Sequence, residues 1–176
     1  MKKSAFLLIV GLISIVASAG TVSFQADKTD VIPGEVVKIS VVATDNCTSI
    51  YISEILSDVG GTALNFFLNP GFIHFLRVGT AVNSGNTLIT GIAGIAPLVY
   101  PPDPVMAGEV LYSFDFTVPY FDIGSPLTIS AAGDLFFQFD DFTDIKDIGS
   151  VALEVIPEPI TIALLGLGGL FIRRRK

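Results

Sequence analysis

Hydrophobic and polar residues alternate with a period of two along much of the middle of the chain. The run Val110–Val118 sets valine, tyrosine and phenylalanine against leucine, serine, aspartate and threonine, and Val37–Ala43 shows the same pattern. Such alternation is typical of a half-buried β-strand, because successive side chains point to opposite faces of a sheet. Shorter apolar runs, separated by turns rich in Gly, Pro and Asn, predict further strands at Thr21–Gln25, Ala63–Leu68, Phe72–Val78, Thr87–Ile92, Pro126–Ala131, Leu135–Phe139 and Ser150–Val155.

One segment has a mixed pattern. Four apolar residues follow the i, i+3, i+4, i+7 spacing of a helix: Ile52, Ile55, Leu56 and Val59. This spacing predicts a helical turn at Ser53–Asp58, whereas Ser49–Ile52 has the character of a short strand, and the pattern leaves both open. Around nine short strands without an internal repeat predict an all-β fold, an antiparallel β-sandwich that forms one domain over residues 20–156.

The first nineteen residues have the layout of a secretory signal peptide. Lys2 and Lys3 precede the apolar run Ala5–Val16, and Ala17 and Ala19 supply the small residues of a cleavage site. The apolar run is shorter than the ~20 residues of a membrane span. We expect residues 1–19 to form a signal helix that signal peptidase removes after Ala19.

The C-terminus combines three parts in order. Pro157, Glu158 and Pro159 are followed by an apolar stretch, residues 160–172, and by the basic end Arg173–Lys176. The prolines disfavour a helix at the tripeptide, whereas the apolar stretch predicts a hydrophobic helix of about 20 Å, shorter than the ~30 Å core of a bilayer. The basic end favours the cytoplasmic side of a membrane. We expect this helix to hold the chain in the inner membrane.

This order of parts over residues 157–176 resembles the PEP-CTERM sorting signal. The resemblance assigns sorting and processing roles to Pro157, Glu158, Pro159, Arg173, Arg174 and Arg175. It implies recognition by an exosortase, a membrane-embedded protease that would cut near the tripeptide, in a Gram-negative bacterium. It also implies an exported protein that is anchored in the membrane before processing and then resides at the cell surface or in an extracellular polysaccharide matrix. An uncleaved tail that acts as a plain membrane anchor is the alternative.

A second resemblance concerns the body of the chain. Val22–Phe24, the Pro33-Gly34 turn and the alternating strand that follows it to Val41 are similar to the opening of cohesin-like domains, and Ala107–Phe116 is similar to a later long strand of these domains. The resemblance implies a jelly-roll β-sandwich that binds another protein or a carbohydrate-associated module. Another immunoglobulin-like or carbohydrate-binding sandwich would show the same periodicity and is the alternative.

Composition removes several classes of function. Only 15% of the residues are charged, the net charge is −7, and residues 20–156 hold sixteen acidic side chains against four basic ones. Nucleic-acid binding needs a basic surface, so we expect no nucleic-acid partner. A single cysteine rules out an internal disulfide framework and a cysteine-rich metal site.

The sequence contains no convincing catalytic set. His74 is the one histidine and Cys47 the one cysteine. The sequence has neither a metal-binding histidine pair nor a Gly-x-Ser-x-Gly elbow. We expect His74 on a strand with a mixed face and Cys47 in an exposed loop, with no catalytic role for either. We therefore expect the chain not to be an enzyme and to need no cofactor.

Acidic side chains form the densest polar cluster of the sequence. Asp140, Asp141, Asp144 and Asp147 follow one another closely, and loops between sandwich strands often supply carboxylates to Ca²⁺. A calcium site and a solvated acidic loop are both compatible with this spacing, which lacks the glycine and final glutamate of an EF-hand. A hydrolase that uses Asp140 and Asp141 is a further alternative.

These observations together predict a non-catalytic structural or adhesive role, with a polysaccharide or another surface protein as partner. A calcium-dependent module that binds carbohydrate or protein is the alternative. Carbohydrate binding usually relies on exposed aromatic rings, yet the sequence has no Trp and its phenylalanines alternate into the expected core. Tyr100 and Tyr120, each beside a proline, are the aromatic residues that we expect to be most exposed.

Overall fold

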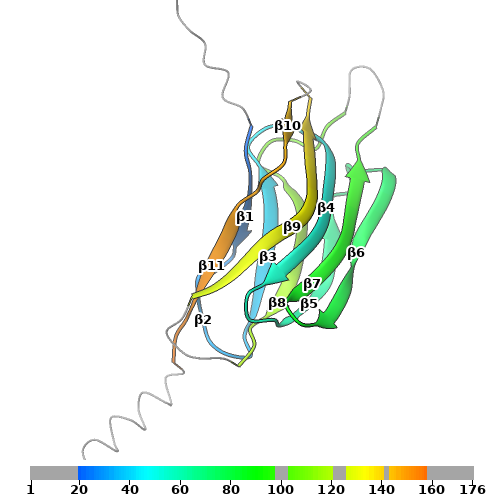
Figure 1. Cartoon of the computed structure of the whole chain (residues 1–176). Coiled ribbons are helices and arrows are strands. Elements are labelled where there is room, and N and C mark those ends of the chain that lie inside the picture. Colours follow the sequence, from blue (N-terminus) through cyan, green and yellow to red (C-terminus); the bar gives the residue numbers. More distant parts are fainter. Residues whose placement is uncertain (1–19, 98–102, 121–125, 141–142, 158–176) are drawn as a thin grey trace, which may run out of the picture.

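Two β-sheets pack face to face into a sandwich (Figure 1). The computed structural model describes residues 20–97, 103–120, 126–140 and 143–157, and all regular structure within them is β-strand. The strands are β1 Val22–Ala26, β2 Asp30–Val31, β3 Val36–Ala43, β4 Cys47–Ser57, β5 Thr62–Leu68, β6 His74–Ser84, β7 Thr87–Ile95, β8 Val110–Thr117, β9 Pro126–Phe139, β10 Asp144–Ile145 and β11 Ser150–Val155. The predicted all-β sandwich is therefore confirmed.

The two sheets differ in size. The smaller has the order β1-β3-β8-β5, and the larger has the order β2-β11-β9-β4-β7-β6, with β10 paired to β9. The pairs are antiparallel except that of β2 with β11, which is parallel. The two-residue strands β2 and β10 are missing from the sequence-based prediction, because two residues are too few to show alternation.

The segment with the mixed pattern is one continuous strand, β4. The strand interpretation of Ser49–Ile52 is thus confirmed, and the helical turn at Ser53–Asp58 is wrong. Ile52 and Ile55 are both fully buried although they are three residues apart. The register of β4 against β9 shifts between Ile52 and Glu54. Across this β-bulge β4 advances two residues and β9 advances three, so the extra residue lies in β9. The apolar phase of β4 changes at the same place and imitates the spacing of a helix.

Gly133, which lies in β9 at this bulge, explains why the sequence predicts two strands where the structure has one. Gly133 interrupts the apolar pattern, but β9 runs unbroken past it as a 14-residue strand. Gly133 has a φ of +75°, and a Cβ on it would lie 2.9 Å from the Cβ and Oγ of Ser53. Only glycine fits this position, because other residues rarely adopt a positive φ and because their Cβ would clash with Ser53. The break in the pattern therefore marks the bulge rather than the end of a strand.

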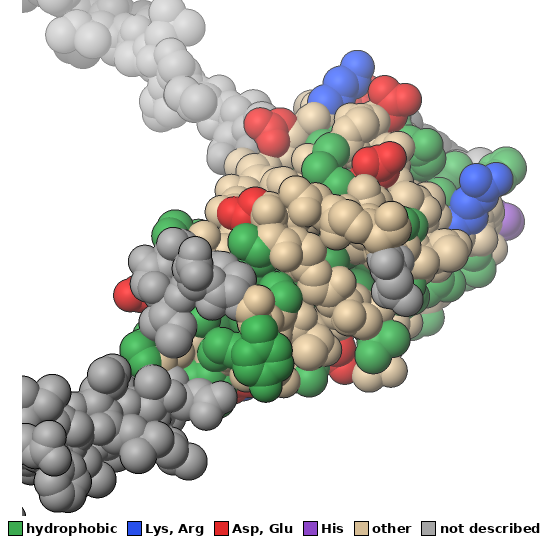
Figure 2. All heavy atoms as spheres, turned by 60° about the horizontal axis from the view of Figure 1, so that its bottom comes forward, with side chains coloured by type: hydrophobic (Ala, Val, Ile, Leu, Met, Phe, Trp, Pro, Cys, Tyr) green, Lys and Arg blue, Asp and Glu red, His purple; other side chains and the backbone are tan. Residues whose placement is uncertain are grey.

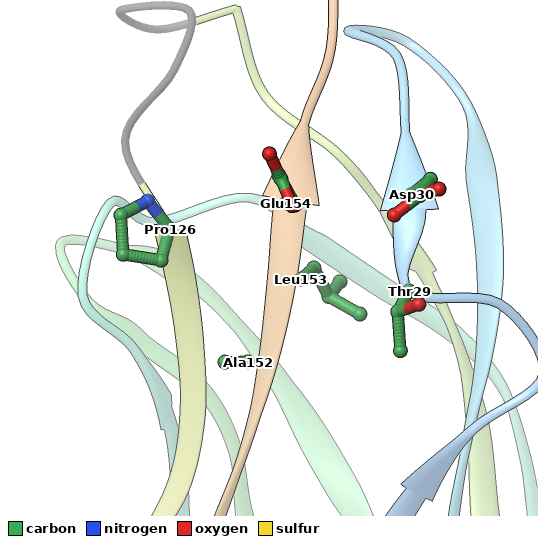
Figure 3. A pocket seen from close by; sticks show the side chains of 6 residues that line it. All are labelled: Thr29, Asp30, Pro126, Ala152, Leu153 and Glu154. Atoms are coloured by element: carbon green, nitrogen blue, oxygen red, sulfur yellow. The ribbon is translucent and has the colours of Figure 1, made fainter.

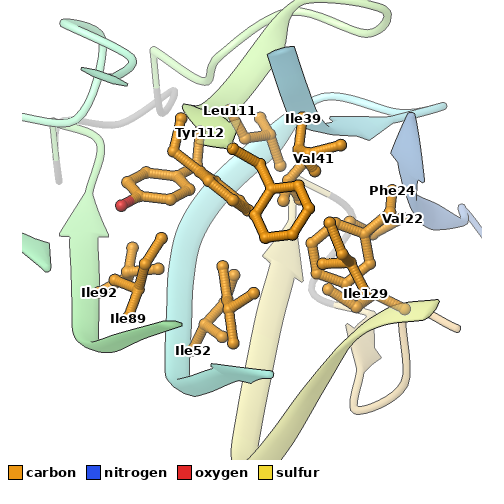
Figure 4. Packing of buried hydrophobic residues seen from close by; sticks show 14 of the residues in the cluster. Val22, Phe24, Ile39, Val41, Ile52, Ile89, Ile92, Leu111, Tyr112 and Ile129 are labelled. Atoms are coloured by element: carbon orange, nitrogen blue, oxygen red, sulfur yellow. The ribbon is translucent and has the colours of Figure 1, made fainter. Parts of the chain in front are cut away.

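Inward-facing side chains of both sheets form one core (Figure 4). Phe114, Phe116 and Tyr112 from β8 pack opposite isoleucines of the larger sheet, all with at most 2% of their surface exposed. Burial of each large apolar side chain contributes ~1.5–3 kcal/mol to stability. The Tyr112 hydroxyl crosses the sandwich and donates a 2.8 Å hydrogen bond to the Val78 carbonyl on β6. This bond ties the outermost strand of the larger sheet to the opposite sheet.

The two ends of the described chain lie at opposite ends of the sandwich (Figure 1). The signal helix expected at residues 1–19 and the hydrophobic helix expected at residues 160–172 lie outside the described residues. Among the residues that are described, no helix is long and apolar enough to cross a membrane.

Candidate functional site

The C-terminal motif begins almost directly at the last strand of the sandwich. β11 ends at Val155, the Ile156 amide donates a 2.9 Å hydrogen bond to the Val31 carbonyl, and Pro157 follows as a half-buried residue. The tripeptide therefore starts two residues beyond a strand that is paired on both sides. The other predicted processing residues lie outside the described part of the chain: Ala17, Ala19, Glu158, Pro159, Arg173, Arg174 and Arg175.

A shallow hollow lies beside this exit, between β9, β11 and β2 (Figure 3). It has a volume of about 400 Å³ and is lined by Thr29, Asp30, Pro126, Ala152, Leu153 and Glu154. Asp30 and Glu154 are register partners on neighbouring parallel strands, so two exposed carboxylates face the same opening. The lining residues offer no basic side chain to neutralise them. The hollow is thus a small acidic depression next to the tail.

The predicted acidic cluster is spread along the ends of β9 and β10. The Asp140 carboxylate accepts a 2.9 Å hydrogen bond from the Asn46 amide, and the Asp147 carboxylate accepts a 2.8 Å hydrogen bond from the Gly149 amide. Asp144 accepts a longer bond from Gln138, and Asp141 lies outside the described residues. Within residues 20–97, 103–120, 126–140 and 143–157, no three His, Cys, Asp or Glu side chains gather closely enough to hold a metal ion. The calcium site stays a prediction.

Cys47 does not lie in an exposed loop, so that expectation is wrong. It is the first residue of β4 and is fully buried, because its backbone pairs with Val105 and turns the side chain into the core. Its thiol donates a 3.2 Å hydrogen bond to the Ser49 carbonyl, and burial raises the pKa of the Cys47 thiol to about 12. His74 is exposed at the start of β6, on a strand as expected. A buried protonated thiol and an exposed imidazole do not form a nucleophile–base pair.

A groove opens where the outer strands of the two sheets, β5 and β6, meet at one side of the sandwich; we refer to it as the β5–β6 groove. It has a volume of about 510 Å³, and eight of its nine lining residues are apolar: Phe66, Phe67, Leu68, Pro70, Phe72, Ile73, Leu76 and Val78, with Asn69 as the ninth. Figure 2 shows hydrophobic side chains gathered beside the histidine at this edge of the molecule. Sequence reasoning missed the groove, since single strands do not show which edges meet.

Both strands of the β5–β6 groove carry a bulge with an unusual backbone. The register of β5 shifts between Leu64 and Phe67, and that of β6 shifts between His74 and Arg77. Within each shift one residue that is not glycine has a φ of +52°, Asn65 in β5 and Phe75 in β6. Asparagine tolerates this conformation, and the Asn65 amide donates a 2.7 Å hydrogen bond to Asp115. Phenylalanine does not, so the backbone at Phe75 is strained.

The bulges also overturn the expectation that the phenylalanines alternate into the core. Phe67 is 43% exposed and Phe75 is 76% exposed, because each bulge changes the phase of its strand and turns a ring outward. Tyr120 is 82% exposed, as expected, and Tyr100 lies outside the described residues. Among the aromatic residues that the structure describes, the two most exposed thus lie on β6 and on the loop after β8.

One basic side chain stands beside the β5–β6 groove. Arg77 lies between Leu76 and Val78 on β6 and is exposed. The ion pairs of the described chain join Lys28 to Glu35 and Lys38 to Asp115, so Arg77 takes part in neither. Leu76 and Val78 line the groove and Arg77 does not, because successive side chains of a strand point to opposite faces.

Comparison with known proteins identifies a sorting motif in the sequence and a group of structural neighbours. Residues 155–176 match the PEP-CTERM protein-sorting motif, as the sequence resemblance predicts. The structural neighbours are cohesin modules, which confirms the second resemblance at the level of the fold. A comparison with curated proteins finds no match.

Three of these neighbours show the extent of the likeness. A type I cohesin of Clostridium thermocellum, solved in a cohesin–dockerin complex, has a TM-score of 0.57 at 12% identity, over 77% of this chain and 99% of that chain. The sixth cohesin of scaffoldin B from Acetivibrio cellulolyticus, in complex with a dockerin, has a TM-score of 0.55 at 11% identity over the same shares. A type II cohesin of Acetivibrio cellulolyticus has a TM-score of 0.55 at 15% identity, over 80% and 92%.

Proposed function

We propose that this chain is an exported protein whose cohesin-like sandwich is a non-catalytic, protein-binding structural module, delivered by its PEP-CTERM tail. The observation that carries the proposal is the attachment of a matching sorting motif, residues 155–176, directly to the closing strand of a complete sandwich. The cohesins of two structural neighbours were solved in complex with dockerins, which supports a protein as the partner.

The proposal divides the chain into three parts with separate partners. Residues 1–19 act as the signal peptide and meet signal peptidase, residues 20–156 form the functional body, and residues 157–176 are recognised by an exosortase. The hydrophobic stretch at 160–172 would hold the chain in the inner membrane until processing. The body then remains at the cell surface or in the polysaccharide matrix of a Gram-negative bacterium.

A binding role suits the chemistry of the described residues better than catalysis does. The buried Cys47 has a raised pKa, so its thiol is protonated at neutral pH. His74 is exposed, and within the described residues no hydrogen bond joins it to an acidic side chain that would orient it as a base. The β5–β6 groove is apolar, which suits recognition of another surface more than proton transfer.

The experiment that tests the proposal is the intact mass of the mature protein in the cell-bound and released fractions of its host. A mass that starts at Gly20 and ends near Pro157–Pro159 would support export and removal of the tail. A mass that retains Arg173–Lys176 in both fractions would show a lasting anchor, and the sorting part of the proposal would fail. A Glu158→Ala variant serves as the control, since it alters the tripeptide and leaves the sandwich untouched.

A further inference from the structure

We propose that removal of the signal peptide completes an ion pair between the new α-ammonium of Gly20 and the carboxylate of Asp45. The mature body is then more stable than a chain that keeps residues before Gly20. The inference rests on the proposed function, in which signal peptidase cuts after Ala19. It adds a partner for the new terminus and a link between processing and the stability of the sandwich.

The pairing of β1 with β3 continues beyond both strands and sets Gly20 opposite Asp45. Past the last register pair of these strands, the Thr21 amide donates a 2.8 Å hydrogen bond to Thr44 Oγ1. The Thr44 amide donates a second 2.8 Å hydrogen bond to the Thr21 carbonyl. The backbone is therefore held in place up to the residue that cleavage makes the first of the chain.

Gly20 is buried and closely surrounded at this end of the sandwich. A Cβ on Gly20 would lie 2.6 Å from Oδ2 of Asp45 and 2.9 Å from Cε2 of Phe139, the last residue of β9. Figure 1 shows β1 starting at the end of the molecule where β9 and β10 meet. The Gly20 nitrogen is bonded to the same Cα, so it lies within about 5 Å of the carboxylate oxygen. An opposite charge at this range favours the charged form of an amine.

Cleavage changes the charge at this point. In the precursor the Gly20 nitrogen belongs to a neutral peptide bond with Ala19. A free α-ammonium has an ordinary pKa of ~7.7–8.0 and is mostly protonated at neutral pH. The Asp45 carboxylate makes no hydrogen bond or ion pair with the described residues. The new ammonium therefore meets a carboxylate that no other group neutralises.

The other charged groups at this end support a cation at Gly20 and do not replace it. Asp140 follows the end of β9, and Glu109 lies in the loop that is hydrogen-bonded to the end of β3. Both are acidic. Lys146 follows β10, which pairs with β9, and takes part in neither ion pair of the described chain. The Asp45 side chain is exposed, so the ion pair contributes a modest amount of stability.

The test compares the mature protein that begins at Gly20 with three variants. Asp45→Asn removes the carboxylate and keeps the shape of the side chain. A chain that retains Ala19 has a neutral amide at Gly20. Asp134→Asn is the matched control, since Asp134 is exposed on β9 beside Gly133 and makes no hydrogen bond or ion pair with the described residues. The pKa of the α-ammonium is measured by NMR, and Tm is measured from pH 6 to pH 10.

The pKa of the Gly20 α-ammonium should lie above the ~7.7–8.0 of an ordinary terminus. Asp45→Asn should return it to that range, and Asp134→Asn should leave it raised. A raised folded pKa gives stability that is fully present below the unfolded pKa and is lost as the pH rises through the folded pKa. Asp45→Asn and the chain with Ala19 should therefore lower Tm by ~1–3 °C at pH 6 and by much less at pH 10.

Three results would overturn the ion pair: an ordinary pKa in wild type, equal effects of Asp45→Asn and Asp134→Asn, or a Tm difference that does not change with pH. A chain with Ala19 that is as stable as wild type would overturn the link to processing. The mass measurement decides a separate question. A mature chain that starts elsewhere would refute the predicted signal peptidase site, whereas NMR on a chain that begins at Gly20 decides the ion pair in either case.

Discussion

Replacing Tyr112 by phenylalanine tests whether one hydrogen bond holds the edge strand β6 in place. The substitution keeps the fully buried ring and removes only the hydroxyl that donates to the Val78 carbonyl at 2.8 Å. The net contribution of such a bond is ~0.5–1.5 kcal/mol, and a carbonyl left unpaired in the core costs ~1–3 kcal/mol. Val78 is 43% exposed, so water can reach part of its surroundings and the lower range applies. We expect a loss of about 1–1.5 kcal/mol.

The assay is denaturant unfolding together with amide hydrogen exchange. The loss should shorten protection mainly on β6 and lower Tm by ~2–5 °C in a domain of this size. Burial raises the pKa of the Tyr112 phenol, so its hydroxyl remains a donor at pH 10, where an exposed tyrosine titrates. The difference between wild type and Tyr112→Phe should therefore persist at that pH.

Tyr120→Phe is the matched control, because this ring is 82% exposed and its hydroxyl makes no comparable bond across the core. We expect it to change stability by less than ~0.5 kcal/mol. If both variants lose the same stability, or if Tyr112→Phe unfolds like wild type with unchanged exchange on β6, the hydrogen bond does not anchor the edge strand.

Three further predictions follow from the core and the turns. Gly133→Ala should destabilise the body by ~2–4 kcal/mol in denaturant unfolding, because the new Cβ would require a positive φ and would clash with the Ser53 side chain. Gly149→Ala is the control: Gly149 has a φ of +65° but open space around it, so this substitution should cost only ~1 kcal/mol. Equal losses would show that the contact with Ser53 is relieved. Cys47 should react with a thiol reagent at pH 8 only as fast as the chain unfolds, and rapid labelling of the native protein would contradict its burial. Hydrogen bonds from a lysine side chain and a backbone amide hold the pKa of Glu35 below its ordinary value. Its contribution is therefore present above about pH 4.3 and lost as the pH falls through the folded pKa, so Glu35→Gln should lose its stability difference from wild type between pH 6 and pH 3; a constant difference would refute the assignment.

The alternation of apolar residues predicted most of the fold, because burial on one face imposes a period of two on every strand. It failed where the sheet itself breaks that period. The one bulge that sets Ile52–Glu54 of β4 against Gly133 of β9 made β4 look helical and β9 look like two strands. A bulge depends on the strand opposite, and a single segment does not carry that information.

Among the candidate sites, the sequence predicted the one that is linear in the chain and missed the one that forms from distant strands. The tail motif was predicted from the sequence, because it is a linear pattern that can be recognised without the fold, and residues 155–176 match it. The β5–β6 groove was not, because it forms from two strands that lie in different sheets. Cys47 was misplaced since the polar residues around it suggested a loop, while pairing with Val105 buries it.

The place of β11 in the larger sheet sets the order of events during export. β11 lies between β9 and β2, so both of these strands have an open side until the last six residues of the body arrive. A chain delivered from its N-terminus therefore completes its sheet at the moment when the Pro-Glu-Pro segment emerges behind it. A product that stops before Ser150 lacks both the strand that closes the larger sheet and the sorting motif, so the motif is present only on chains that can complete the sandwich.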